Sequence, residues 1–293
     1  MMKIILGTAQ LGMDYGVNNE LGKPSHELAQ KIVDFALASG ITDFDTARGY
    51  GDSEAVLGEC LSKSAGAKKY HIITKVPKLS KFTSDDLVKI IQESLDKLGR
   101  IDTLLLHHVD DMYETDQLSG YIALQEVFQC NLGVSVYTPE EALYALEQDW
   151  VSCIQVPSNL ADMRFVEAGV FAAAKEKRVR VMVRSVYLQG LVFAEKPPSR
   201  LADLPGLAVF LSEMNAFCEK WNCSAQELAL SVACQFFEHA DVLIGVESPS
   251  QLEETLTTVK QASKNLEIAT AWNEVSHHVT DELIDPRTWN EYK

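Results

Sequence analysis

The sequence predicts an α/β protein of the (β/α)8 barrel class, a TIM barrel built as a single domain over residues 1–293. Short, apolar, β-branched segments alternate with helical patterns from one end to the other. Eight such units fit into about 250 residues, and their strands are too continuously apolar for a half-solvated sheet. A Rossmann fold is the alternative, but it needs a G-x-G-x-x-G turn after the first strand, which GTAQLG (7–12) does not convincingly supply.

The strands are predicted in chain order from short apolar runs. The first, KIILGT, is short and β-branched and stops at a glycine and a threonine. The eight segments are 3–8, 42–45, 70–76, 102–107, 132–136, 152–156, 179–185 and 241–246. A helical pattern lies between each strand and the next.

The helices between them carry start and stop signals. Residues 26–39 place Leu28, Ile32, Phe35 and Ala36 on one face, and a glycine ends the pattern. Capping boxes are predicted at 138–141 and 224–227, and a similar start at 248–251. The longest irregular connection, 186–205, follows the seventh strand and is predicted to be either a functional lid or a disordered loop. The tail, 273–293, is predicted to form a short closing helix and an arm.

Composition limits the partners. There are 42 Asp and Glu against 26 Lys and Arg, a formal charge of -16, which argues against nucleic acid or an anionic membrane. No apolar run approaches about 18 residues, and the N-terminus does not resemble a signal peptide. Six cysteines without CxxC or metal-ligand spacing predict a reduced, cytoplasmic protein without a metal site. No oligomeric state is predicted.

Four polar residues follow the ends of neighbouring strands, where a barrel brings side chains together. They are Asp45, Tyr50, Lys75 and one of the two histidines that end the fourth strand. Each alone has an ordinary structural explanation, as a cap, a packing residue or a solvated charge. Together they suggest acid–base chemistry, because a lysine ammonium beside a phenol lowers the phenol pKa and a carboxylate holds the ammonium in place.

These strand ends resemble the aldo-keto reductase superfamily. GITDFDTARGYGDSEAVLGE (40–59) is similar to its DTA-to-SE signature, ITKV (73–76) to its lysine strand and IDTLLLHHVD (101–110) to its histidine strand. The resemblance implies NAD(P)(H)-dependent interconversion of a carbonyl and an alcohol. It implies that Tyr50 donates the proton, that Lys75 and Asp45 tune it, and that His107 orients the carbonyl.

The resemblance also implies a dinucleotide site. Ser135 and Gln155 match positions that hold the carboxamide, although Val136 replaces an expected Asn, and Arg184 replaces an aromatic ring. The remaining cofactor residues are Thr8, Ser185, Leu188, Gly190, Gly245, Glu247, Gln251, Glu254 and Thr255. Relatives favour NADP(H), but the loop after strand eight has Glu247 and no basic residue before position 260. Because a carboxylate repels a 2′-phosphate, NAD(H) is predicted to compete.

Substrate specificity is expected in the loops at the same end. Met13 and Tyr15 in the first loop and His108 after the fourth strand are the predicted substrate residues. Acidic residues in these loops favour a hydroxylated, neutral or cationic substrate, such as a sugar, over an anionic one. Two alternatives stay open: a non-catalytic dinucleotide-binding module or redox sensor on the same fold, and a lyase that forms a Schiff base through Lys75.

Overall fold

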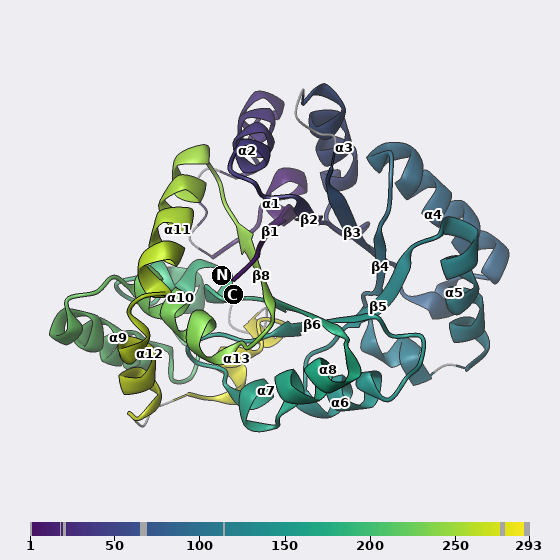
Figure 1. Cartoon of the computed structure of the whole chain (residues 1–293). Helices are drawn as coiled ribbons and strands as arrows, with labels where there is room; N and C mark the ends of the chain where they lie inside the picture. The colour runs from purple at the N-terminus through teal and green to yellow at the C-terminus, as the bar shows by residue number, and fades with distance from the viewer. Residues whose placement is uncertain are drawn as a thin grey trace.

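Eight parallel strands close into a barrel in chain order, with β8 hydrogen-bonded to β1 (Figure 1). They are β1 (Ile4–Gly7), β2 (Asp43–Asp45), β3 (His71–Val76), β4 (Thr103–Leu106), β5 (Asn131–Ser135), β6 (Cys153–Pro157), β7 (Arg180–Arg184) and β8 (Asp241–Gly245). The predicted TIM barrel is confirmed. This computed structural model describes residues 2–17, 19, 22–64, 69–113, 115–275 and 279–289, without the side chains of 115 and 116.

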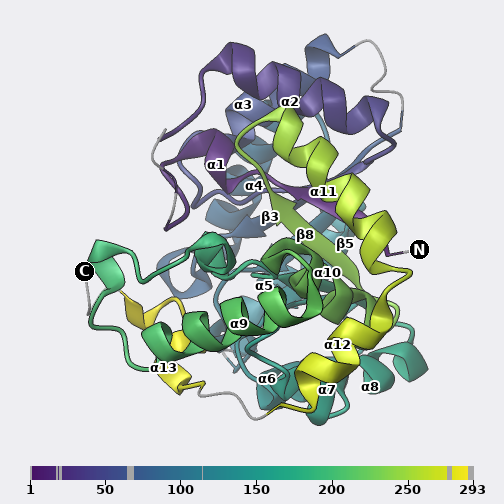
Figure 2. The ribbon, with the colours of Figure 1, turned by 90° about the vertical axis from the view of Figure 1, so that its left-hand side faces the viewer.

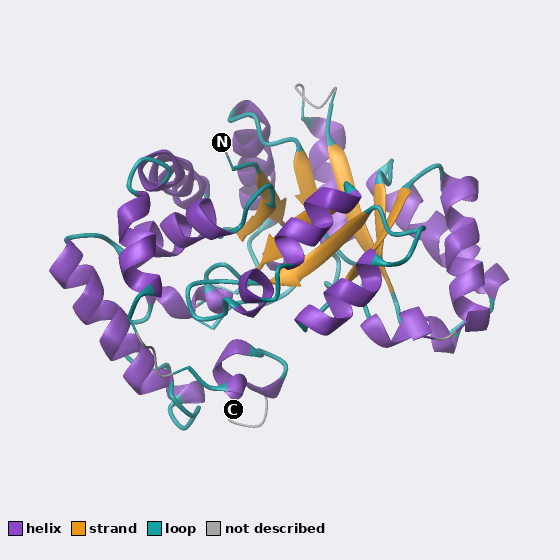
Figure 3. Ribbon diagram, turned by 60° about the horizontal axis from the view of Figure 1, so that its bottom comes forward, coloured by secondary structure: helices purple, strands orange, loops and turns teal. Residues whose placement is uncertain are grey.

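Helices connect the strands and enclose them (Figure 3). They are α1 (Ala9–Gly12), α2 (His26–Ala38), α3 (Ser53–Lys63), α4 (Ser84–Leu98), α5 (Thr115–Phe128), α6 (Pro139–Leu146), α7 (Arg164–Glu167), α8 (Val170–Lys177), α9 (Leu207–Trp221), α10 (Ala225–Phe236), α11 (Pro249–Ala262), α12 (Leu266–Asn273) and α13 (Asp281–Ile284). Short 3-10 turns are η1 (Leu79–Lys81), η2 (Val109–Tyr113), η3 (Leu188–Phe193) and η4 (Ser199–Leu201). Among the described helices, none has both the length and the apolar character needed to cross a membrane.

Strand alternation separates two apolar layers. The inner layer, at the barrel axis, contains Ile5, Ile73, Leu105, Cys153 and Met182. The residues next to these in sequence face outward into a larger cluster between the strands and the helices. Because Leu105 faces inward, the residue two positions later in the chain also faces the barrel mouth. All six cysteines are free thiols.

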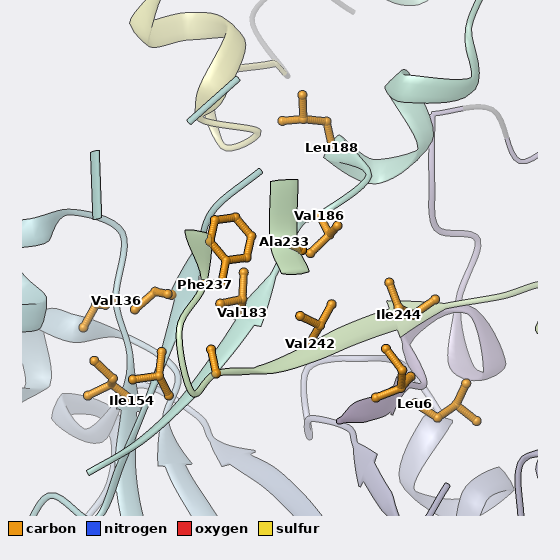
Figure 4. Close-up of a cluster of buried hydrophobic side chains, with 14 of the residues drawn as sticks. Leu6, Val136, Ile154, Val183, Val186, Leu188, Ala233, Phe237, Val242 and Ile244 are labelled. Atoms are coloured by element: carbon orange, nitrogen blue, oxygen red, sulfur yellow. The ribbon is translucent and has the colours of Figure 1, made fainter. Parts of the chain in front are cut away.

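The outer layer is visible beside β7 and β8. Figure 4 shows Ala233 and Phe237, at the end of α10, lying over Val183 and Val242 of these two strands. All four side chains are at most 4% exposed. Burying a phenylalanine side chain stabilises a fold by roughly 1.5–3 kcal/mol, so this layer fixes the helices on the barrel.

The helix starts follow the predicted signals with one difference. Thr138 and Glu141 form a complete capping box at the start of α6, as predicted. At α10, the Ser224 hydroxyl accepts from Glu227 N at 3.0 Å, which is only half of the predicted box. The Glu227 carboxylate instead accepts a hydrogen bond from Asn265, at 3.3 Å, and so ties α10 to the segment before α12.

The buried face of α2 is rotated slightly from the prediction. Ile32 and Ala36 are buried as predicted, but Ala29 and Val33 share that face. Leu28 and Phe35 pack only partly buried beside it. The hydrophobic stripe is wider than the four predicted positions, as is common for a helix that packs on a sheet.

The connections after β1 and β7 lie against each other over the barrel mouth. Val17 N donates to Gln189 O at 2.9 Å, and Arg200 donates to Gly16 O at 2.6 Å. The predicted lid, 186–205, is therefore an ordered segment that contains η3 and η4. Figure 2 shows α13, in the tail, on the side of the molecule opposite the N-terminus, where the strands end. The tail is thus placed to line the mouth.

Candidate active site

The carboxyl ends of the strands open into a cavity of about 780 Å³, called the mouth cavity below. Active sites of (β/α)8 barrels form at this end. Most residues predicted from the sequence line it: Thr8, Tyr15, Asp45, Tyr50, His107, Ser135, Gln155, Arg184, Ser185, Gly190, Gly245, Glu247, Gln251, Glu254 and Thr255. Lys75 lies directly behind Asp45.

Lys75 is held in a buried ion pair. Its ammonium donates to Asp45 Oδ2 at 2.7 Å and to the Thr46 carbonyl oxygen at 2.8 Å, and the Lys75 side chain has no exposed surface. Burial lowers the pKa of Lys75, while the Asp45 carboxylate acts to raise it. The ammonium nitrogen lies 4.9 Å from the centre of the Tyr50 ring. The pair therefore places a fixed positive charge under this ring.

Tyr50 and His107 meet edge to face, with ring centres 5.8 Å apart. Burial and the Asp45 charge raise the pKa of Tyr50. The net shift is opposite to the one expected from Lys75, because burial and Asp45, with which the ammonium is paired, outweigh any lowering by the ammonium. Burial, with Lys75, His108 and Arg184 nearby, lowers the pKa of His107 to about 3. At neutral pH the phenol is protonated and the imidazole is neutral.

Two glycines allow the loop that carries Tyr50 to approach α1. A Cβ atom on Gly12 would lie 2.0 Å from Tyr50 O and 2.3 Å from Ser53 N. A Cβ atom on Gly51, where φ is 59°, would lie 2.3 Å from Gly12 O. Two hydroxyl groups connect the same segments: Ser53 donates to Thr8 O at 2.7 Å, and Thr8 donates to the Asp45 carbonyl oxygen at 2.9 Å. The backbone between Asp45 and Ser53 is thus held from one side by α1.

Gln155 and Ser135 lie beside Asp45. The Gln155 amide nitrogen donates to Asp45 Oδ1 at 2.8 Å, and its buried oxygen has no hydrogen-bond partner among the described residues. A buried acceptor without a partner is rare and costly, and here it lines the mouth cavity. This oxygen suits the N–H of a bound carboxamide. The Val136 side chain faces outward into the apolar layer, so it supplies no contact there (Figure 4).

A stack of three side chains flanks this place. The guanidinium groups of Arg184 and Arg287 both lie over the Tyr137 ring, 4.4 Å and 3.7 Å from its centre. All three line the mouth cavity. Tyr137 and Arg287 were not predicted. Tyr137 could have been found, because strand alternation puts it on the face of Ser135; Arg287 comes from the tail and had no sequence signal.

The residues after β7 and β8 that were predicted to hold the dinucleotide also line the mouth cavity, except the Leu188 side chain. Glu247 N donates to Gln251 Oε1 at 2.7 Å, and burial and Asp14 raise the pKa of Glu247. Gln226, which was not predicted, donates to Tyr187 Oη at 3.3 Å and to Thr255 Oγ1 at 3.1 Å. Among the described lining residues, Arg184 and Arg287 are the arginines, and there is no lysine.

Besides the buried Lys75, three predicted site residues do not line the mouth cavity. Met13 is 37% exposed and faces solvent. His108 is also exposed, and its ring centre lies 5.6 Å from that of His107. The Leu188 side chain is fully buried in the outer apolar layer, so only its backbone can face a ligand (Figure 4). Tyr15 does line the mouth cavity, and burial raises its pKa to about 12, so its hydroxyl keeps its proton.

Comparisons with known proteins agree with this architecture. The aldo/keto reductase family model matches residues 3–275. L-galactose dehydrogenase of Arabidopsis thaliana is 26% identical over 264 residues, which cover 82% of this chain and 80% of that protein. Among solved structures, an aldo-keto reductase from Bacillus halodurans in its holo form is similar with a TM-score of 0.74 and 20% identity, over 97% of this chain and 95% of that one. A glycerol dehydrogenase from Gluconobacter oxydans is similar with a TM-score of 0.67 and 21% identity, over 97% and 94%. The chain therefore belongs to the aldo/keto reductase family and is an oxidoreductase that interconverts carbonyls and alcohols.

Proposed function

We propose that the protein is an NAD(P)(H)-dependent reductase or dehydrogenase in which Tyr50 is the general acid or base. The observation that carries the proposal is the convergence of Tyr50, His107 and the Lys75–Asp45 pair at one end of the mouth cavity. A working set of positioned acid–base groups contributes on the order of 10²–10⁴ in rate. A module that only binds a dinucleotide has no need for this arrangement.

Each residue has a role that follows from its protonation. Because the pKa of Tyr50 is raised, the phenol holds a proton that it can deliver to a carbonyl oxygen. Because His107 is neutral, it can donate one N–H to the same oxygen without competing as an acid. Lys75 keeps its charge beside Asp45, and this charge stabilises Tyr50 when the phenol has lost its proton.

The cofactor site fits a nicotinamide dinucleotide. The unpartnered Gln155 oxygen and the Ser135 hydroxyl would hold the carboxamide, and Ser185, Gly190 and the start of α11 would hold the remainder. The cofactor, when bound, supplies or accepts the hydride. The helix start is suited to this, because the positive end of the dipole of α11 lies at the mouth cavity, which Gln251 lines.

We propose that NAD(H) competes with NADP(H). Glu247 lines the dinucleotide side of the mouth cavity, and Gln251 and Glu254 beside it are not basic. A carboxylate there repels a 2′-phosphate and can accept a hydrogen bond from a free 2′-hydroxyl. Titrating both reduced cofactors by fluorescence tests this. A hundredfold preference for NADPH would exclude the idea.

The substrate is proposed to be a hydroxylated carbonyl compound or a polyol. The two named relatives are an L-galactose dehydrogenase and a glycerol dehydrogenase, which supports this class. A screen of aldehydes, aldoses and polyols with both cofactors, followed at the reduced-nicotinamide absorbance band, tests the reaction class. His107→Ala should abolish most turnover, while His108→Ala, outside the mouth cavity, should change it far less. Equal losses would contradict the assigned strand register.

A Schiff-base lyase is disfavoured by the geometry of Lys75. Its ammonium is fully buried, paired with Asp45, and absent from the lining of the mouth cavity, so a carbonyl carbon has no approach to it. Borohydride treatment in the presence of each carbonyl in the screen should therefore trap nothing on Lys75. A stable adduct at this residue by mass spectrometry would favour the lyase.

A further inference from the structure

Arg184 makes no direct ion pair with a carboxylate of the described residues. Its guanidinium donates to the Val136 carbonyl oxygen at 3.1 Å and lies over the Tyr137 ring. Among the described residues, no carboxylate lies within 4.0 Å of it. Arginine has five N–H donors, so several remain available toward the mouth cavity, which Arg184 lines.

The other partly buried arginines behave differently. Arg48 pairs with Glu93, Arg164 with Asp162 at 2.8 Å, and Arg180 with both Asp43 and Asp241. Removing a charge from water is costly unless a partner compensates it. In a chain with a formal charge of -16, an arginine left without a carboxylate inside a cavity indicates that a ligand supplies the anion.

The position of Arg184 places this anion near the reacting end. Arg184 lies at the end of β7 and contacts Val136 and Tyr137. These two residues directly follow Ser135, the last residue of β5. The Arg184 charge also acts on the pKa of Tyr50 and His107.

The neighbouring groups keep Arg184 available. The charges of Asp285 and Arg184 interact, but the Asp285 carboxylate is engaged by Arg287 through two nitrogens, and the Arg287 guanidinium also lies against the Tyr137 ring. The tail thus places Arg287 against the Tyr137 ring, while the Asp285 carboxylate is already bound by Arg287. Arg184 itself contacts the Val136 carbonyl oxygen, the Ser185 hydroxyl at 3.5 Å and the Tyr137 ring, none of which carries a charge.

The acidic loops that favoured a neutral or cationic substrate do not face the mouth cavity. Asp111 is fully buried and accepts from Leu79 N at 3.0 Å. Asp110 is exposed and lies 3.8 Å from the Lys78 ammonium. Asp14 does not line the mouth cavity either. The reason for excluding an anionic substrate therefore disappears.

We propose that the substrate carries an acidic group, a carboxylate or a phosphate, which Arg184 binds while the carbonyl lies at Tyr50 and His107. This inference rests on the proposed reductase function and names its substrate class. Guanidinium groups suit both kinds of anion, because their planar N–H pairs match two oxygens. The Arg184–Tyr137–Arg287 stack fixes the plane of the guanidinium.

The test compares substrates that differ only in charge. Succinic semialdehyde is paired with butanal, and D-glucuronate and D-glucose 6-phosphate are each paired with D-glucose. We expect kcat/KM to favour one charged member by between about tenfold and a hundredfold, as for a charge-assisted hydrogen bond. Which acid is preferred separates carboxylate from phosphate. Equal values for charged and neutral members would overturn the inference while leaving the reductase function intact.

Two variants assign the effect to Arg184. Arg184→Met should reduce the ratio of charged to neutral kcat/KM at least tenfold. Lys175→Met, which removes one positive charge from an exposed pair on α8, should leave the ratio unchanged. NADH affinity is measured in parallel by fluorescence. If Arg184→Met weakens NADH binding tenfold and leaves the substrate ratio unchanged, the anion is the cofactor's pyrophosphate and the inference fails.

A binding measurement decides the inference even without turnover. Succinate, which cannot react, should raise the melting temperature of the wild-type protein but not that of Arg184→Met, and 1,4-butanediol should raise neither. If no carbonyl is turned over, the proposed reaction fails, but a succinate shift that depends on Arg184 still supports the anion site. An equal succinate shift in both proteins, or none in the wild type, would overturn it.

Discussion

Gly12→Ala tests how α1 positions the catalytic loop. In the wild-type protein, Gly12 is buried at the end of α1, against the backbone of Tyr50 and Ser53. The new methyl group would lie 2.0 Å from Tyr50 O and 2.3 Å from Ser53 N. Both are backbone atoms, so no side chain can rotate away, and α1 and the Tyr50 loop must separate.

The magnitude follows from two opposing effects. Alanine has a higher helix propensity than glycine, which stabilises by about 1 kcal/mol. Overpacking of a rigid interior costs about 1–3 kcal/mol, so the net effect is a loss of stability of up to about 2 kcal/mol. A displacement of about 1 Å at a catalytic group can lower the rate on the order of 10²-fold, and Tyr50 is the group displaced.

Gly58→Ala is the matched control. A Cβ atom on Gly58, in α3, would lie 1.9 Å from Lys97 O at the end of α4, so the clash is equally severe but lies away from the mouth cavity. Urea denaturation should show comparable losses of stability in both variants. Only Gly12→Ala should lose kcat per folded molecule. If the two variants lose kcat equally, or if neither does, the positioning role of Gly12 is refuted.

Three further outcomes are expected. Burial alone would raise the pKa of Asp43, but its ion pairs with Lys3 and Arg180 lower it. The stabilisation by this carboxylate is therefore present above about pH 4 and is lost as the pH falls through the folded pKa. Asp43→Asn should reduce the free energy of unfolding in urea at pH 7 by roughly 3–5 kcal/mol, and a loss below 1 kcal/mol would contradict this. Since the pKa of His107 is about 3, kcat/KM between pH 5 and 9 should show no histidine titration; a limb near pH 6.5 that His107→Gln removes would contradict this. Thr138→Ala removes a cap and should cost about 1 kcal/mol in thermal unfolding, and an unchanged melting temperature would contradict the capping role.

The fold was predictable because its signals are local. A buried strand between turn residues shows in sequence as an apolar run, so all eight strands were located to within one or two residues. Alternation then placed Leu105 and His107 on one face. The sequence pattern alone did not say which face lines the barrel; the resemblance assigned it, and the inner layer agrees.

The site was less predictable where it depends on three-dimensional packing. Arg287 reaches the mouth cavity because the tail folds back, and no local pattern reports this. Met13 and His108 follow strands whose ends form the mouth cavity, but their side chains are exposed to solvent. The pKa of Tyr50 depends on its burial and on Asp45, the ion-pair partner of Lys75, and the strand pattern predicts neither the burial nor the pairing.

The most direct measurement of the central claim is single turnover by Tyr50→Phe with each reduced cofactor bound. The substitution removes only the hydroxyl, while the ring keeps its contacts with His107 and the Lys75 ammonium. Cofactor affinity should stay within about twofold of the wild type, and the chemical step should slow by on the order of 10²–10⁴. A chemical step that stays within tenfold of the wild-type rate would show that Tyr50 does not transfer the proton.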